Sequence, residues 1–163
     1  MRTGSKEAAD PRELDTPGGD IKELLSIAAG YGLRVHGAHL DGDKIGAYAP
    51  ELDRIYFDLS LSQAERRSVI AHEIGHHIHG HLCDSTGNEW QADTYAAALL
   101  VEPEWYAHLE RINHDAEWIA EEMHVAPWTI TDYRRYCLQR LAHVTYARPR
   151  MGAGQWDYSA RTV

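Results

Sequence analysis

The pentapeptide His72-Glu73-Ile74-Gly75-His76 constrains the fold of this chain more than any other segment. Two histidines four positions apart lie on one face of an α-helix, where both imidazoles can bind a single metal ion. The flanking residues favour a helix, because Ser62 and Glu65 form a capping box and Val69, Ile70, Ile74 and Ile78 recur at helical spacing. We therefore expect a helix over residues 62–80, with His72 and His76 facing one cleft.

A catalytic zinc ion takes three protein ligands and a water molecule, so one more ligand is needed. The pattern HExxHxxGxxH is excluded, because His79 and Leu82 occupy the positions of its glycine and third histidine. A carboxylate from a second helix is the remaining solution. Glu89 and Asp93 lie one helical turn apart, just before an alanine-rich run, and are the candidates.

These motifs resemble those of known metallopeptidases. Glu89 and Asp93 match the NExxAD pattern of the glutamate-zincins, and HEIGH together with an alanine-rich helix ending in LLVEP resembles the ImmA/IrrE family over residues 20–145. The resemblance implies that Glu89 is the third zinc ligand and that Asp93 orients a zinc-bound histidine. Asp93 stands where the family most often has asparagine, and this difference removes none of the expected zinc ligands. Glu89 can also be read as a helix cap with Thr86, a role that needs no metal.

The expected chemistry is zinc-dependent peptide hydrolysis with one catalytic Zn²⁺ bound by His72, His76 and Glu89. Glu73 follows the first histidine and lies beside the metal-binding face, so we expect it to be the general base. The other nearby histidines are interpreted as polar-face or loop residues that do not bind the metal: His77, His79 and His81. His124 either stabilises an oxyanion or is an ordinary surface or core histidine.

The predicted fold class is α+β: a mainly helical, zincin-like metalloprotease domain with a small antiparallel sheet. Asp20 caps a first helix that ends at Gly30 or Gly32, and strand-like segments follow at 33–40, 44–50 and 54–60. A helix-turn-helix-like pair of helices is expected in 115–145, broken at 125–127. The predicted domain spans residues 20–145, and this helix pair forms its last part. Residues 1–19 and 146–163 are expected to be flexible tails, the second one basic.

The distribution of charge along the chain limits which binding partners are expected. Residues 1–129 hold 10 Lys/Arg and 23 Asp/Glu, a net charge of −13, whereas residues 130–163 hold six Arg and two Asp, a net charge of +4. An acidic body disfavours binding to nucleic-acid phosphates, so DNA binding through Arg134, Arg135 and Arg140 is not expected. The family resemblance implies cleavage of a helix-turn-helix transcriptional repressor of a mobile element, prophage or stress regulon. The alternative is a non-catalytic zinc-binding regulatory module that binds DNA or a partner protein.

The sequence has no long apolar run and only two cysteines, so we expect a cytoplasmic protein with reduced thiols and no membrane segment. The oligomeric state, the scissile bond and the activating signal are not readable from the sequence.

Overall fold

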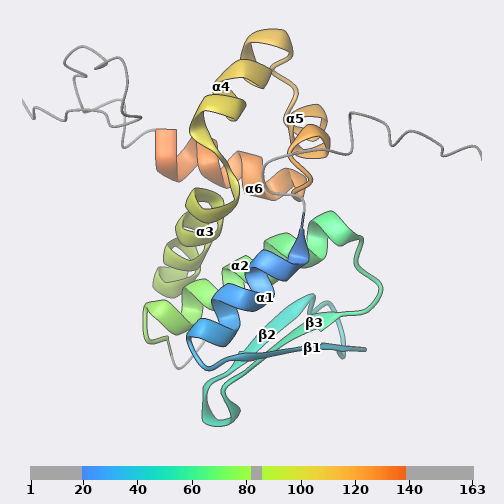
Figure 1. Ribbon diagram of the computed structural model, residues 1–163, viewed down its shortest axis with the longest axis vertical. Helices are drawn as coiled ribbons and strands as arrows, with labels where there is room; N and C mark the ends of the chain where they lie inside the picture. The colour runs from blue at the N-terminus through green and yellow to red at the C-terminus, as the bar shows by residue number, and fades with distance from the viewer. Residues whose placement is uncertain (1–19, 82–85, 139–163) are drawn as a thin grey trace, which may run out of the picture.

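The computed structural model describes residues 20–81 and 86–138, and the predicted tails lie outside these ranges. The described residues form an α+β fold in which helices cover one face of a small sheet (Figure 1). Six α-helices are present in this part of the chain, with a 3-10 turn η2 at Pro50–Leu52 and a π-helical segment η3 at Tyr133–Leu138. The helices are α1 (Ile21–Gly30), α2 (Gln63–Ile78), α3 (Thr86–Leu100), α4 (Pro103–Ile112), α5 (Ala116–Glu122) and α6 (Pro127–Asp132).

The sheet differs from the predicted antiparallel one. Its strands are β1 (Arg34–Ala38), β2 (Gly46–Ala49) and β3 (Arg54–Asp58), in the order β1-β3-β2. β2 and β3 are antiparallel, but β1 and β3 are parallel, so the sheet is mixed. The prediction was wrong because it paired strands in chain order, whereas β3 inserts between β1 and β2. Both outer strands are edges, and β2 is the edge next to α2.

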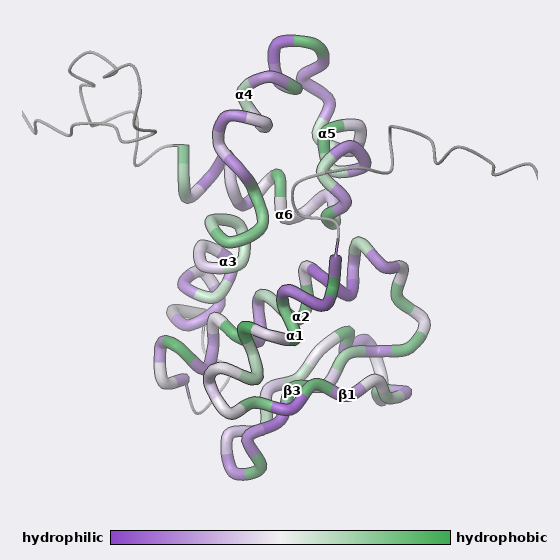
Figure 2. Tube along the Cα trace, viewed as in Figure 1, coloured by the Kyte–Doolittle hydropathy of each residue, from purple (hydrophilic) through white to green (hydrophobic). Residues whose placement is uncertain are grey.

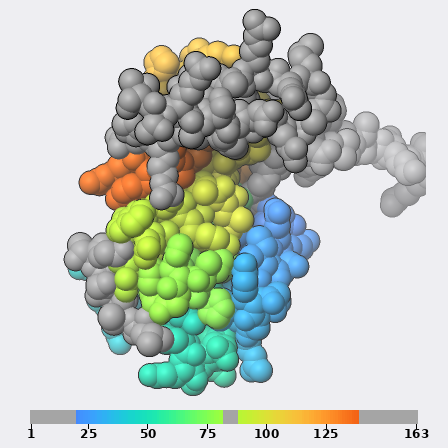
Figure 3. All heavy atoms as spheres, turned by 90° about the vertical axis from the view of Figure 1, so that its left-hand side faces the viewer, coloured from blue at the N-terminus to red at the C-terminus, as the bar shows by residue number. Residues whose placement is uncertain are grey.

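The crossing of α2 and α3 is unusually close at one point. A Cβ atom on Gly75 would lie 2.9 Å from the Cα atom of Ala92 and 3.1 Å from its carbonyl oxygen. Only glycine therefore fits here without a shift of one backbone. Figure 3 shows α3 against α2, with α1 beside them and the sheet below. Hydrophobic and hydrophilic residues are interspersed along α1 and α2 (Figure 2), as expected for helices with one buried face.

The helices α5 and α6 correspond to the predicted helix pair, with the break before Pro127 as expected. The pair is fastened to α2 by buried polar groups. Ser68 Oγ accepts hydrogen bonds from the backbone N–H of Ala126 (2.9 Å) and from Thr129 Oγ1 (2.8 Å). The buried Arg67 donates to the carbonyl oxygen of His124 at the end of α5. The second helix of the pair is shorter than predicted, because it changes to the π-helical segment η3 after Asp132.

None of the helices in the described ranges has the length and apolar character needed to cross a membrane.

Candidate metal centre

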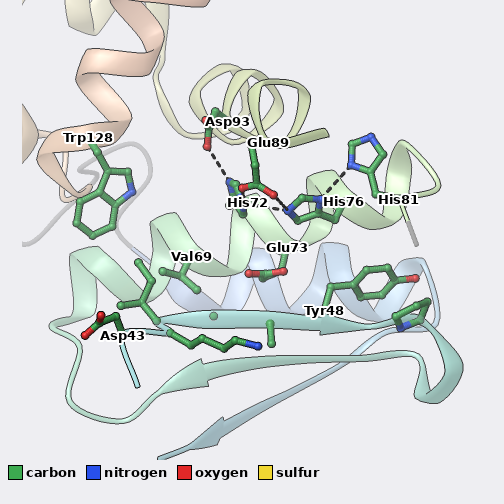
Figure 4. Close-up of a pocket in the computed structure, with 15 residues that line it drawn as sticks. Asp43, Tyr48, Val69, His72, Glu73, His76, His81, Glu89, Asp93 and Trp128 are labelled. Atoms are coloured by element: carbon green, nitrogen blue, oxygen red, sulfur yellow. Dashed lines mark hydrogen bonds and ion pairs between the residues drawn. The ribbon is translucent and has the colours of Figure 1, made fainter. Parts of the chain in front are cut away.

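The side chains of His72, His76 and Glu89 converge between α2 and α3 (Figure 4). His72 Nε2 lies 3.0 Å from His76 Nε2, and the Glu89 carboxylate oxygens lie 3.3 Å from His72 Nε2 and 3.4 Å from His76 Nε2. A tetrahedral zinc with bonds of ~2.0–2.1 Å requires ligand atoms about 3.3–3.4 Å apart. Two imidazole nitrogens and a carboxylate oxygen are also a common zinc ligand set. The three residues therefore fit a metal ion.

The local sequence explains why these atoms converge. The Ser62–Glu65 capping box is present at the start of α2, and the histidines follow on one face of this helix. Glu89 lies in the first turn of α3 and reaches across the close crossing at Gly75. The cluster thus depends on the α2–α3 crossing as much as on the motif.

Asp93, one turn beyond Glu89, contacts His72 on the side opposite the cluster. Its Oδ1 lies 2.9 Å from His72 Nδ1, so it can accept the Nδ1 proton and leave Nε2 directed at the other ligand atoms. Burial lowers the pKa of His72, but the hydrogen bond to Asp93 and the negative charges of Glu73, Asp93 and Glu89 outweigh burial. The net result is a His72 pKa above its usual value.

Glu73 is buried, with only 6% of its surface exposed, and its carboxylate faces the cavity beside the two histidines (Figure 4). Gly46 of β2 makes room for it: a Cβ atom at this position would lie 2.6 Å from Glu73 Oε1 and 2.4 Å from Val69 Cγ1. No sequence pattern singles out Gly46, because Glu73, its neighbour in space, lies on a different element.

The cluster opens onto a cavity of about 590 Å³ between β2, α2, α3 and α6. The residues that line it include Gly46, Ala47 and Tyr48 of β2, together with Val69, Glu73 and Trp128. Tyr48 points away from the metal centre, because its hydroxyl lies 2.8 Å from His77 Nδ1. The ligand atoms therefore face a space that can admit a peptide segment.

The histidines outside the motif have different positions. His77 pairs with Tyr48, and His79 is exposed, so neither is part of the three-residue cluster. His124 is exposed at the turn between α5 and α6, with a φ of 52°, and does not line the cavity. His81 is buried against His76, which the prediction of a loop residue did not anticipate.

Asp132 was also missed by sequence reasoning. It lies at the end of α6, where burial and the negative charge of Asp93 raise its pKa to about 6, while His72 and Arg135 oppose this rise. It is 39 positions from Asp93 in the chain, and no local motif connects the two.

Arg134, a residue considered for DNA contact, is engaged within the protein. Its guanidinium donates to the hydroxyl of Tyr106 (2.9 Å), the carboxylate of Glu110 (3.0 Å) and the carbonyl oxygen of His114 (2.6 Å). Arg135 is exposed and lies over the ring of Tyr136, whereas Arg140 lies outside the described residues.

Comparisons with known proteins agree with this arrangement. A search of curated proteins found no match. Among solved structures, a Mycobacterium tuberculosis transcriptional regulator is similar, with a TM-score of 0.57 and 22% sequence identity. The alignment covers 83% of this chain but 43% of that regulator, so this chain spans less than half of its length, and the likeness concerns the fold alone. Residues 30–130 match the profile of the IrrE N-terminal-like domain, a peptidase family. The match covers most of the chain and includes all the residues of the metal centre, and the chain belongs to this family.

Proposed function

We propose that this chain is a zinc-dependent endopeptidase. The observation that carries the proposal is the convergence of His72, His76 and Glu89 at a cavity that also contains the Glu73 carboxylate. A purely structural zinc site is closed by four protein ligands, whereas the described part of the chain offers three ligands here, and they face open space. Zinc bound there would supply Lewis acidity, which activates water and polarises a peptide carbonyl.

The residues of the chain have distinct parts in this mechanism. Glu73, held between α2 and β2, takes the proton of the attacking water and passes it to the nitrogen of the leaving amine. Asp93 accepts the Nδ1 proton of His72 and so fixes both the tautomer and the orientation of that ligand. Gly46 keeps the space above Glu73 free of a side chain.

The substrate we propose is a protein segment in extended conformation. β2 is an edge strand that lines the cavity, so its backbone can pair with an added strand and bring a peptide bond to the metal centre. A helix-turn-helix repressor of a mobile element, prophage or stress regulon, acting in the cytoplasm, is the partner that the family resemblance favours.

DNA is not the partner we propose. The net charge of −13 on residues 1–129 opposes DNA binding. Arg134 also uses, in contacts within the protein, the N–H donors that a DNA phosphate would need. We therefore assign α5 and α6, the helix-turn-helix-like pair, to the peptidase domain.

Cleavage of a peptide library tests the proposed activity, with products identified by mass spectrometry. We expect the zinc-loaded protein to cleave and Glu73→Gln to lose about 10²–10⁴-fold in rate, because the amide has nearly the same shape but cannot accept a proton. Metal analysis provides the control, since the Gln variant should still bind one zinc. Equal cleavage by both proteins, or cleavage unaffected by a chelator, would refute the mechanism.

A further inference from the structure

The turn after α2 brings His81 back to the helix it has just left. Gly80 has a φ of +66°, and its N–H donates to the carbonyl oxygen of His77 (3.0 Å). The N–H of His81 donates to the carbonyl oxygen of His76 (3.0 Å). This pair of bonds is the Schellman motif, which reverses the chain at a helix end. As a result the His81 side chain is buried, with 9% of its surface exposed, although it lies beyond the helix.

A chain of hydrogen bonds runs from α3 through His81 to His76. Gln91 Oε1 lies 2.9 Å from His81 Nε2, and His81 Nδ1 lies 2.9 Å from His76 Nδ1 (Figure 4 shows the second contact). An amide oxygen only accepts, so Nε2 of His81 carries the proton. Neutral imidazole has one N–H, so His81 Nδ1 accepts the proton of His76 Nδ1. Nε2 of His76 then carries the lone pair that can bind metal.

We propose that His81 is a positioning residue for the metal centre, with Gln91 as its support. It fixes the tautomer and ring orientation of His76, as Asp93 does for His72 on the other side of the cluster. The two histidine ligands thus have chemically different outer partners: a carboxylate for His72 and a neutral imidazole–amide chain for His76. This inference rests on the proposed zinc site but concerns residues outside it.

The proposal predicts which substitutions at position 81 restore zinc binding. Asparagine places an amide oxygen near the position of Nδ1, whereas glutamine places its polar atoms near the position of Nε2. We therefore expect His81→Leu and His81→Gln to weaken zinc binding about 10–100-fold in a chelator competition, the usual cost of losing an outer partner. His81→Asn should restore most of the affinity, and His39→Leu, at an exposed histidine that does not line the cavity, should have none of this effect.

The tautomer of His76 gives a second readout that does not depend on any variant. In the metal-free wild type, ¹⁵N NMR of labelled histidine at a pH above the imidazole titration should show the proton of His76 on Nδ1. The cobalt-substituted protein should also change its visible absorption in His81→Leu but not in His39→Leu.

The outcomes separate this inference from the proposed function. A wild-type protein that takes up no zinc would refute both. One bound zinc with wild-type affinity in His81→Leu, an asparagine variant no better than the leucine variant, or a metal-free His76 with its proton on Nε2 would overturn the role of His81 alone.

Discussion

Replacing Gly75 by alanine should damage the metal centre without touching any ligand. The added Cβ would lie 2.9 Å from Ala92 Cα, and ordinary contact begins at 3.4 Å, so α2 and α3 have to separate by about 0.5 Å to restore it. Metal sites tolerate deviations of only ~0.2 Å in ligand distances. Because α3 carries Glu89, we expect zinc affinity to fall even in molecules that remain folded.

The stability effect of this change can be worked from two opposing contributions. Alanine is favoured over glycine inside a helix by about 1 kcal/mol. Overpacking of a close contact costs about 1–3 kcal/mol. The net effect on the free energy of unfolding should therefore be a loss of about 0–2 kcal/mol.

The assay is denaturant unfolding of the metal-free protein, followed by zinc titration of the folded variant. Gly30→Ala is the matched control, because a Cβ there meets nothing within 4 Å, and it should bind zinc as the wild type does. A Gly75→Ala protein that gains about 1 kcal/mol and binds zinc with unchanged affinity would refute the claim that this crossing sets the ligand geometry.

Three further outcomes are expected. Asp132→Asn should stabilise the metal-free protein at pH 7.5 by about 1–2 kcal/mol, because burial raises the pKa of Asp132 to about 6 and the charged form is disfavoured. The wild-type protein should gain stability as the pH falls through 6 towards 4, because Asp132 becomes protonated in the folded protein before it does in the unfolded chain. Equal free energies of unfolding in urea for the two proteins at pH 7.5 would contradict this expectation. Arg134→Ala should lower the free energy of unfolding by about 1–2 kcal/mol, since it removes hydrogen bonds to Tyr106 and Glu110. DNA affinity should be negligible before and after this change. Specific DNA binding that is lost in the variant, in a gel-shift assay, would instead indicate a DNA-binding role for Arg134. Gly80→Ala should cost about 1–2 kcal/mol through its φ of +66° alone, because nothing lies within 4 Å of the added Cβ; an unchanged melting temperature would mean that the turn relaxes.

The parts of the site that could be predicted are those fixed by local geometry. His72 and His76 follow from helical periodicity, and the capping box at Ser62 fixes where that helix begins. Glu89 and Asp93 were candidates because one helical turn separates them and the ligand count required a carboxylate, and the family resemblance implied their separate roles. The structure places Glu89 with both histidines and Asp93 behind His72.

The features that were not predicted depend on packing between distant segments or on the geometry of a turn. In the sheet, which packs against α1 and α2, β3 lies between β1 and β2, and no local pattern in the sequence indicates this order. Asp132 meets Asp93 only through the docking of α6. His81 had a local signal: Gly80 after a helix predicts a reversed chain, so a residue just beyond it returns to the last turn. His81 is not one of the three clustered ligand residues, but it is buried against His76 rather than exposed in a loop.

The docking of the helix pair decides how α5 and α6 should be interpreted. Ser68, four residues before His72, accepts two hydrogen bonds from the start of α6, and neither bond is exposed to solvent. From that position α6 places Trp128 in the cavity wall and Asp132 within electrostatic reach of His72. α6 therefore contributes one ring to the cavity wall and one carboxyl group near His72, while Pro127, Trp128 and Thr131 keep exposed surface. The segment that resembles a helix-turn-helix is therefore built into the same structural unit as the metal ligands.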